Sequence, residues 1–250
     1  MNFDHPSIKQ AKIDLTAALR LAALLGFHEG VCNHFSLALP AAELGAEAFL
    51  INPQGIHWSD MTPADLVMVD IDGKKLEGRN NVEPTAFFIH GCVHRAKKNA
   101  KCIMHTHMPY ATSITLLENG KLEWISQNSL RFYGRTAYDT EYGGLALDDS
   151  EGERITSKLG DAELMFMANH GVMLCGESVA NVFDDMYFLE RACEVQVLAM
   201  STGRPLKYIP EGVAAQVRAQ FDQERQQSRL HFEAMKLRLD KVSPGWRDFV

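Results

Sequence analysis

The stretch Cys102-Ile-Met-His-Thr-His107 is an apolar segment that leads directly into two histidines separated by one residue. The apolar part, residues 102–104, predicts a buried β-strand. Because residues i and i+2 of a strand point to the same face, the imidazoles of His105 and His107 can converge on one ion. Neutral imidazole is a common ligand of zinc, iron, manganese and cobalt. The stretch therefore predicts a core strand that ends in a metal site.

A second apolar strand, residues 164–168, ends at Asn169-His170-Gly171, where the glycine permits a tight turn of the backbone. Three protein ligands with one position open for water or substrate are the layout of a catalytic metal site. We therefore predict that His105, His107 and His170 bind one divalent metal ion. The alternative on spacing alone is that they are unrelated histidines at the ends of strands.

The remaining periodicity mixes helices and strands without strict alternation along the chain. Apolar residues that recur every three or four positions predict amphipathic helices, and short alternating or apolar runs predict strands. We expect helices at residues 7–25, 85–96, 110–117, 178–200 and 213–241, and strands at residues 35–39, 49–51, 66–71, 102–104, 164–168 and 172–174. This mixture predicts helices packed on a mixed or antiparallel sheet.

Composition excludes several classes of partner. The net charge of −7 over 250 residues gives no electrostatic reason to expect nucleic acid, and no segment approaches the ~18 apolar residues of a membrane span. Residues 1–10 are polar and do not resemble a secretory signal. The five cysteines form no CxxC pair, which argues against a disulfide framework or a cysteine zinc cage. We expect a cytoplasmic protein that binds neither nucleic acid nor membrane.

Three motifs carry a likeness to a known family. They are Glu83-Pro-Thr-Ala-Phe-Phe-Ile-His-Gly-Cys-Val-His-Arg95, His105-Thr-His-Met-Pro-Tyr-Ala-Thr112 and Asn169-His-Gly-Val-Met-Leu-Cys-Gly176. With Cys32-Asn-His-Phe-Ser36 and Asn52-Pro-Gln-Gly55, they make residues 14–203 resemble the class II aldolase/adducin family. The Asn-His-Phe-Ser variant is closer to the adducin-like branch.

The resemblance implies a three-layer α/β/α sandwich with a central mixed, largely antiparallel sheet. It implies a single domain over residues 1–250, with a core at about 14–203 and a C-terminal helical tail at about 204–250. It further implies a homotetramer with sites at subunit interfaces, and a divalent metal, usually Zn²⁺, on the three histidines. Fe²⁺, Mn²⁺ and Co²⁺ also suit three imidazoles.

The enzymes of this family include sugar-phosphate aldolases, a pentulose-phosphate epimerase and a thiosugar-phosphate dehydratase. Their shared chemistry is polarisation of a carbonyl or hydroxyl oxygen, which stabilises an enediolate. The Ser-Ser-Glu motif of the aldolases, which carries their acid/base carboxylate, falls here on Pro84, Thr85 and Ala86. Glu83, three residues before Ala86, is the candidate replacement, or else a helix N-terminal carboxylate.

The phosphate-binding loops of the family also look altered. Asn33, Ser36 and Gly55 remain and are predicted to bind substrate, but the loops have fewer hydroxyl donors than those of the aldolases. His34 is a candidate to contact a substrate carboxylate or carbonyl, with simple packing as the alternative.

Other polar residues are weaker candidates. Among Tyr133, Tyr138 and Tyr142 we select Tyr138 as a catalytic residue that could protonate a leaving group, with aromatic packing as the alternative. We expect structural roles for His90 and His94, which share a helix face. We expect Asp184, Asp185 and Glu190 to form a solvated or interface face of their helix.

These observations predict a metal-dependent lyase that acts on a small hydroxy or keto compound, carboxylated and sugar-derived substrates included. Aldol cleavage, decarboxylation and epimerisation all stay open, because each needs the same oxyanion-stabilising metal. Two alternatives come from other classes: a non-catalytic, adducin-like scaffold module, which the loss of Ser-Ser-Glu favours, and an Fe(II)-dependent oxygenase.

Overall fold

The strands of the computed structural model, which describes residues 1–145 and 148–249, form one eight-stranded sheet in the order β4-β3-β2-β1-β5-β8-β7-β6. Its strands are β1 (His34–Ala38), β2 (Ala48–Ile51), β3 (Val67–Asp70), β4 (Lys75–Glu77), β5 (Cys102–Thr106), β6 (Thr136–Asp139), β7 (Leu164–Met167) and β8 (Gly171–Gly176). Neighbouring strands are antiparallel except β6 and β7, which are parallel. The predicted mixed, largely antiparallel sheet is confirmed.

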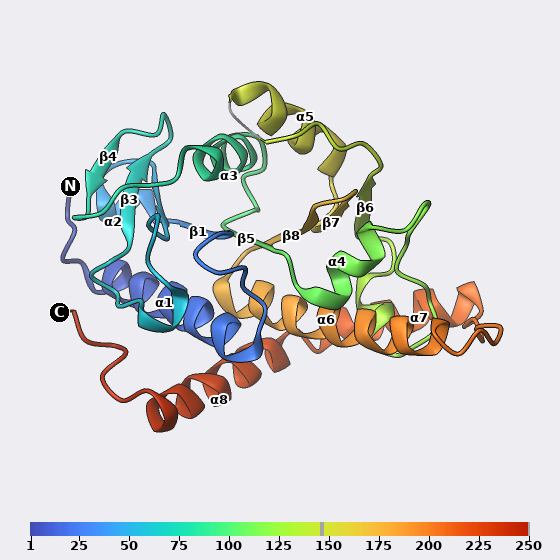
Figure 1. Cartoon of the computed structure of the whole chain (residues 1–250). Helices are drawn as coiled ribbons and strands as arrows, with labels where there is room; N and C mark the ends of the chain where they lie inside the picture. The colour runs from blue at the N-terminus through green and yellow to red at the C-terminus, as the bar shows by residue number, and fades with distance from the viewer. Residues whose placement is uncertain (146–147, 250) are drawn as a thin grey trace.

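Helices cover both faces of this sheet, so the predicted three-layer α/β/α arrangement is confirmed (Figure 1). The helices are α1 (Pro6–Leu25), α2 (Ala41–Leu44), α3 (Pro84–Ala96), α4 (Pro109–Thr115), α5 (Asp149–Leu159), α6 (Val179–Met200), α7 (Glu211–Gln223) and α8 (Gln226–Val242), with 3-10 turns η1 (Trp58–Asp60) and η2 (Ser129–Phe132). Helices α3 and α5 lie on one face, and α1, α6 and α8 lie on the other (Figure 1).

Alternation along β5 decides which layer the metal-binding candidates face. Cys102 and Met104 pack into the larger core with α1 and α6, whereas Ile103 packs into the smaller core with α3 and α5. Because successive side chains of a strand point to opposite faces, His105 shares the face of Ile103. The histidine at the end of β5 therefore faces the layer formed by α3 and α5.

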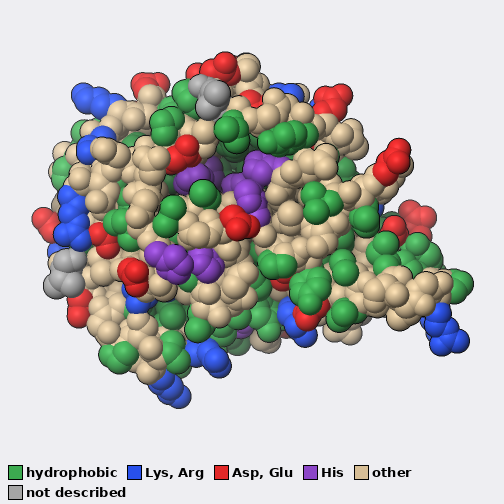
Figure 2. All heavy atoms as spheres, in the orientation of Figure 1, with side chains coloured by type: hydrophobic (Ala, Val, Ile, Leu, Met, Phe, Trp, Pro, Cys, Tyr) green, Lys and Arg blue, Asp and Glu red, His purple; other side chains and the backbone are tan. Residues whose placement is uncertain are grey.

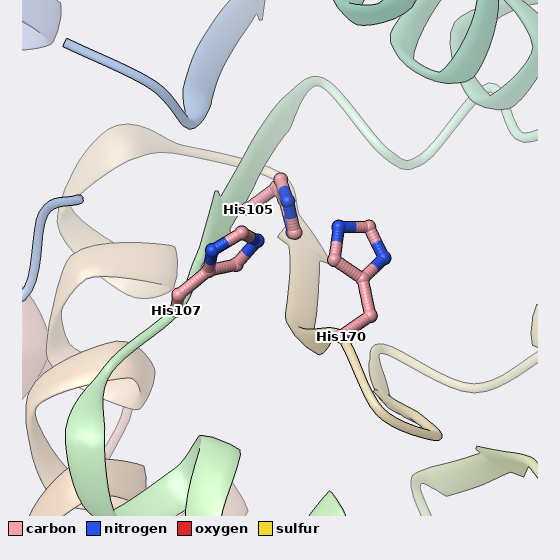
Figure 3. A group of neighbouring side chains, drawn as sticks. All are labelled: His105, His107 and His170. Atoms are coloured by element: carbon pink, nitrogen blue, oxygen red, sulfur yellow. The ribbon is translucent and has the colours of Figure 1, made fainter. Parts of the chain in front are cut away.

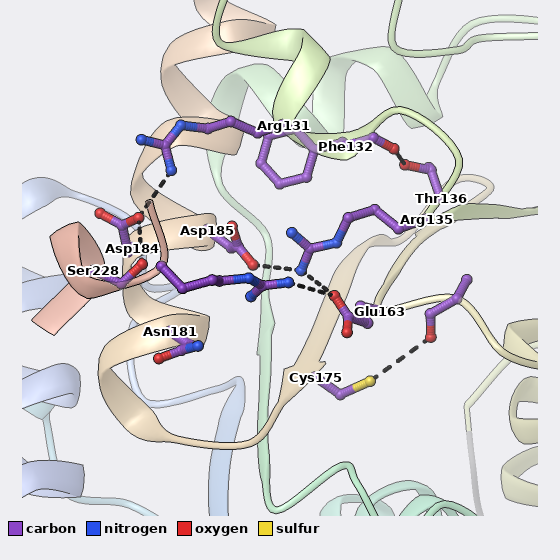
Figure 4. Close-up of polar contacts among 12 residues, drawn as sticks. Arg131, Phe132, Arg135, Thr136, Glu163, Cys175, Asn181, Asp184, Asp185 and Ser228 are labelled. Carbon is purple, nitrogen blue, oxygen red and sulfur yellow. Dashed lines mark hydrogen bonds and ion pairs between the residues drawn. The ribbon is translucent and has the colours of Figure 1, made fainter. Parts of the chain in front are cut away.

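The acidic residues of α6 are buried, so their predicted solvated or interface face is wrong. Asp184, Asp185 and Glu190 expose 1%, 7% and 4% of their surface. Arg131 donates to Asp184 at 2.9 Å and Arg135 donates to Asp185 at 2.6 Å (Figure 4). Both arginines come from a segment around 50 residues away, so helical spacing could not show that these carboxylates have partners.

Glu190 has a different role, because its carboxylate caps another helix. Its two oxygens accept the backbone N–H groups of Tyr110 and Ala111, each at 2.9 Å. These N–H groups lie in the first turn of α4, where a helix has no partners of its own for them. The buried carboxylate therefore fixes the start of the helix that follows His107.

The C-terminal region differs from the single helix predicted at residues 213–241. It forms α7 and α8, with α7 packed against η2 and α8 packed against α1 and α6. The turn at Glu224-Arg225 has neither glycine nor proline, so local sequence gave no sign of it. Strand β6 and the polar helix α5 were also not predicted. Every helix in residues 1–145 and 148–249 is too short or too polar to cross a bilayer.

Candidate metal centre

Three imidazoles meet where β5 ends and β8 begins (Figure 3). One nitrogen from each of His105, His107 and His170 lies within 4.8 Å of the other two. Their ring centroids are 4.8 to 5.0 Å apart. The structure thus brings the predicted set together from two segments more than 60 residues apart in sequence. Figure 2 shows histidine side chains gathered in a hollow on this face of the molecule.

The orientation of His105 leaves one of its nitrogens free for an ion. Its Nδ1 lies 3.0 Å from the carbonyl oxygen of Val172 in the neighbouring strand β8. A carbonyl can only accept, so Nδ1 carries the proton and Nε2 of the neutral ring is a bare lone pair. Burial lowers the pKa of His105 well below its usual value, and the nearby His170 and His107 lower it further. A backbone partner on the far nitrogen is the usual support of a metal-binding histidine.

His107 also has an uncommitted nitrogen. Its Nε2 is buried and, within the described part of the chain, has no hydrogen-bond partner. Its backbone N–H donates to Oδ1 of Asn33 at 3.3 Å. Burial lowers the pKa of His107, so its imidazole is neutral near pH 7. A buried ring nitrogen without a partner, beside two other imidazoles, fits a ligand of a divalent metal ion.

The turn before His170 corrects one detail of the sequence interpretation. Gly171 does not adopt a left-handed conformation; Asn169 does, with φ of 56°. A Cβ atom on Gly171 would lie 2.6 Å from the carbonyl oxygen of Thr106 and 2.7 Å from Cδ2 of His107. The glycine is therefore needed for close approach to β5 rather than for a turn. Burial lowers the pKa of His170 to about 4, with a further lowering by His107.

The two candidate acid/base residues lie beside the triad. His34 pairs directly with His105 across β1 and β5, and its Nε2 lies 3.6 Å from Oε2 of Glu83. Burial lowers the pKa of His34 to about 4, although the Glu83 carboxylate opposes this shift. Glu83 is also the N-cap of α3 and accepts the backbone N–H of Ala86 at 3.1 Å. It thus fills the helix-capping role and still faces His34.

Asn33 contacts the backbone of one residue of the triad, His107. The residue is 2% exposed and adopts φ of 71°. Its side-chain oxygen accepts the backbone N–H of His107, and its backbone carbonyl accepts a hydrogen bond from the side-chain amide of Asn52 at 3.2 Å. Gly55 lies in the exposed turn that follows Asn52, with φ of 79°. The two predicted substrate-binding loops therefore meet through an asparagine pair next to His107.

Two predicted site residues are not brought to the triad. Ser36 is fully buried, and its hydroxyl lies between His90 and His94, out of reach of a substrate. Tyr138 packs on Phe166, on the face of the sheet opposite His105, and its hydroxyl accepts the N–H of Leu122 at 3.2 Å. Tyr138 lies in β6, and its register in this strand sets the face to which it points. The sequence does not predict this strand. Burial raises the pKa of Tyr138 to about 12.

Two further contacts between rings are not predicted by the sequence, and the first of them lies beside the triad. The ring centroid of Tyr142 lies 6.4 Å from that of His170, and 55% of this tyrosine is exposed. His28 and His57, from separate loops, have their Nε2 atoms 3.0 Å apart. Tyr138 lies within β6, whereas Tyr142 lies three residues after this strand ends. The sequence does not predict β6, so it does not separate the two tyrosines. The contact between His28 and His57 leaves no local pattern in the sequence.

Comparison with known proteins defines the class to which this fold and triad belong. Residues 13–197 match the family model of the class II aldolase and adducin N-terminal domain. The chain belongs to this family. A Pseudomonas aeruginosa protein assigned to the class 2 aldolases is 35% identical over 244 residues, which are 95% of this chain and 92% of that protein.

Other relatives carry different names. A Streptomyces niveus protein named a decarboxylase is 32% identical over 79% of this chain and 72% of its own length. Alpha-adducin of Rattus norvegicus is 33% identical over 79% of this chain but only 27% of its own length. The chain therefore belongs to the family, but the names of its relatives describe different activities.

Solved structures agree with the fold. An aldolase II superfamily protein from Pseudomonas syringae has a TM-score of 0.88 and 33% identity, over 97% of each chain. L-fuculose 1-phosphate aldolase from Glaciozyma antarctica has a TM-score of 0.82 and 25% identity, over 96% of this chain and 92% of its own.

Proposed function

We propose that this protein is a divalent-metal-dependent lyase that acts on a small α-hydroxy carbonyl or keto compound. The observation that carries the proposal is the convergence of three neutral imidazoles beside the pair formed by His34 and Glu83. Three nitrogen ligands with an open position match a catalytic zinc site, so we propose Zn²⁺ as the ion held by His105, His107 and His170. When bound, this ion would polarise a substrate oxygen and stabilise enediolate charge.

The acid/base work is assigned to His34 and Glu83. His34 is neutral near pH 7 and faces the triad across the strand pair, so its imidazole can take a proton from the substrate carbon. The carboxylate of Glu83 at 3.6 Å would then stabilise the imidazolium that forms. In epimerisation, the enediolate would regain a proton on the other face of the carbon. In aldol cleavage, the same base would take the proton of the β-hydroxyl group, the C–C bond would break as that oxygen becomes a carbonyl, and the enediolate carbon would then be protonated. The two reactions could therefore share these residues.

Tyr142 replaces Tyr138 in our proposal as the phenol that could protonate a leaving group. Its ring lies beside His170 and is open to solvent, whereas the hydroxyl of Tyr138 is committed to Leu122 on the other face. Asn33 and Gly55 are assigned to the substrate loops, with Asn33 acting through the backbone of His107. The altered loops favour a carboxylate or neutral polyol over a phosphate on the substrate.

The assembly and location are also proposals. Apolar side chains stay exposed on the last turns of α6, where Val195, Leu198 and Met200 expose 40%, 54% and 41%. Such a surface suits subunit contact, and we propose a homotetramer of single-domain subunits in the cytoplasm. Sedimentation velocity of the purified protein tests the assembly directly.

One experiment tests the proposed function without knowledge of the substrate. An enzyme that forms an enediolate exchanges the α-proton of a bound carbonyl compound with solvent, so the zinc-loaded protein is incubated in D₂O with dihydroxyacetone, glycolaldehyde or hydroxypyruvate and followed by ¹H NMR. We expect exchange and about one zinc per chain, both lost in His105→Ala and retained in His5→Ala. A native protein with no stoichiometric metal, or exchange that survives His105→Ala, would refute the proposal.

The same samples separate two further candidates that specific observations favour. The similarity to alpha-adducin and the alanine at position 86 favour a scaffold module, which would show neither exchange nor turnover. Three imidazoles also suit Fe²⁺, and oxygen consumption supported by Fe²⁺ but not by Zn²⁺ would identify an oxygenase. Release of CO₂ from hydroxypyruvate would assign the lyase to decarboxylation.

A further inference from the structure

Two histidines outside the triad face each other from separate loops. His28 follows the end of α1, and His57 immediately precedes η1. Their Nε2 atoms are 3.0 Å apart, and their rings meet edge to face with centroids 4.8 Å apart. The ring centroids of His105 and His170 in the triad have the same separation. The chain therefore brings a second set of imidazole nitrogens together, formed by residues other than the proposed metal ligands.

One proton lies between the two facing nitrogens. Two N–H groups would collide at 3.0 Å, and two bare lone pairs would repel each other. The backbone N–H of Ser59 donates to Nδ1 of His57 at 3.2 Å, so the proton of neutral His57 is on Nε2. Nε2 of His28 is then the acceptor and carries a lone pair directed at its partner. A divalent ion that replaced the shared proton would find two imidazole lone pairs on one side.

Ser59 and Asp60 can support His57 after the proton has moved from Nε2 to Nδ1. The hydroxyl oxygen of Ser59 lies 2.6 Å from Nδ1 of His57 and can accept from it, while the hydroxyl itself donates to Oδ1 of Asp60 at 3.3 Å. An acceptor on the far nitrogen is the usual support of a metal-binding histidine. Two nitrogens at about 2.0–2.1 Å from a tetrahedral zinc ion lie about 3.3 Å apart, so the rings need to separate only slightly.

The surroundings of the pair suit a cation that arrives from solvent. Both imidazoles are partly exposed. Burial lowers the pKa of His28 and His57 lowers it further, although Glu29 opposes the shift, so the ring is neutral near pH 7. Glu29 follows His28 directly and Asp60 lies three residues after His57, and both carboxylates are exposed. The negative charge of these side chains favours a bound cation.

The pair also joins two loops that meet again beside the triad. His28 lies five residues before Asn33, and His57 lies five residues after Asn52. The two asparagines are buried and bonded to each other, and Asn33 accepts the backbone N–H of His107. An ion held by the histidine pair would therefore clamp the exposed ends of two loops whose buried ends are already joined.

We propose that His28 and His57 form a second divalent-metal site, which takes Zn²⁺ through both Nε2 atoms and completes its coordination with water. Imidazole nitrogen suits zinc, nickel and copper, whereas magnesium and calcium prefer oxygen. With two protein ligands in place of three, this site binds zinc more weakly than the triad and fills only in the presence of free zinc. It uses none of the residues assigned to catalysis in the proposed function, so either proposal can fail without the other.

The zinc content of the protein at equilibrium with excess free zinc at pH 7.5 tests the site. Dialysis followed by elemental analysis should give about two zinc ions per chain in the unsubstituted protein and about one in His28→Ala. His57→Gln should also bind about one, because its amide can still donate to Nε2 of His28 but supplies no imidazole ligand. His105→Ala, which disrupts the triad, should retain the ion at the pair.

His5 provides a matched control in the same chain. Its Nδ1 lies 2.7 Å from the hydroxyl of Ser7 and accepts the backbone N–H of that serine at 3.3 Å, as in the contact between His57 and Ser59. Its Nε2 does not face another histidine in the described part of the chain. We therefore expect His5→Ala to bind as many zinc ions as the unsubstituted protein.

Two further measurements follow the second ion without any turnover. In protein labelled with ¹⁵N-histidine, long-range ¹H–¹⁵N spectra should show the proton of His57 moving from Nε2 to Nδ1 as free zinc is added, while His28 stays protonated on Nδ1. Exchange of backbone amides in residues 26–33 and 52–60 should slow at the same zinc concentration, and should not change in His57→Gln.

The outcomes separate this inference from the proposed function. A single zinc ion in the unsubstituted protein, or a second ion that survives both His28→Ala and His57→Gln, overturns the site and leaves only adventitious binding elsewhere on the surface. An unchanged His57 tautomer on filling overturns coordination through its Nε2, and unchanged amide exchange overturns the clamp. Absence of substrate α-proton exchange in the D₂O assay, with the second ion bound as predicted, refutes the proposed function alone.

Discussion

His34 lies directly opposite His105 in the antiparallel pair of β1 and β5, and on its other side it faces the carboxylate of Glu83 at 3.6 Å. A strand pair thus fixes the distance between a candidate metal ligand and a candidate base. The aldolases place their carboxylate three residues later, on the first turn of the helix, where this chain has the buried Ala86. Glu83, at the N-cap of the same helix, is the carboxylate that faces His34 in this chain.

Glu83→Gln tests directly whether Glu83 has the acid/base role that the aldolases give to a carboxylate at the position of Ala86. Glutamine can still accept the N–H of Ala86, so we expect a stability loss of no more than about 1 kcal/mol. It carries no charge to stabilise an imidazolium at His34, so exchange should fall by about 100-fold while zinc content stays unchanged. Glu43→Gln, at an exposed helical position, is the matched control. Equal exchange rates in the two variants would contradict the role of Glu83.

Tyr138→Phe and Tyr142→Phe together test which of the two tyrosines takes part in the reaction. The first removes a hydroxyl bonded to Leu122 and should cost about 1 kcal/mol of stability with no change in turnover. The second removes an exposed hydroxyl beside His170 and should lower the rate of the lyase reaction by about tenfold or more with no change in stability. Urea denaturation and steady-state kinetics read the two effects separately; the reverse pattern would restore Tyr138 as the catalytic phenol.

His94 makes the stability of the fold depend on pH. Burial lowers its pKa from 6.5 to about 4, although the hydrogen bond to Ala100 opposes the shift. Between these values the unfolded chain binds the proton and the folded chain does not, so stability is present above pH 6.5 and is lost as pH falls toward 4. The loss is about 1.4 kcal/mol per pH unit within this window. The difference in unfolding free energy between the unsubstituted protein and His94→Gln, measured from pH 7 to 4, should shrink accordingly; a constant difference would show that His94 does not titrate in this range.

Glu190 links the stability of α4 to the metal centre. Its two oxygens hold the first turn of this helix, which begins two residues after His107. Glu190→Ala leaves two buried N–H groups without an acceptor and should cost about 2 to 4 kcal/mol, whereas Glu190→Gln retains one acceptor and should cost less. Zinc affinity should fall in the same order, as measured by competition with a chelator. Unchanged affinity in Glu190→Ala would mean that α4 does not position His107.

The convergence of the three histidines and the central strands of the sheet could be predicted from sequence, because both depend on local patterns. The alternation at His105 and His107 indicates a shared face, and apolar runs mark the central strands. The contacts of Ser36 and Tyr138 could not be predicted, because each depends on which distant residue packs against its strand. Ser36 meets two histidines of α3, and the orientation of Tyr138 follows from β6, whose partly buried residues carry no clear period.

Gly171→Ala tests how tightly the triad depends on the contact between β5 and β8. The added Cβ would lie 2.6 Å from the backbone oxygen of Thr106 and 2.7 Å from the ring of His107, and both contacts are too short to persist. Rotation of the His107 ring relieves only the second contact, so the backbones of β5 and β8 must also move apart. Both changes displace His107, and zinc affinity should fall by at least about tenfold. Gly176→Ala lies at the other end of β8, where the nearest atom is a methyl group of Val182 at 3.1 Å that can rotate away. Its zinc affinity should match that of the unsubstituted protein. If both variants bind zinc equally well, the close approach of Gly171 to β5 does not determine the position of His107.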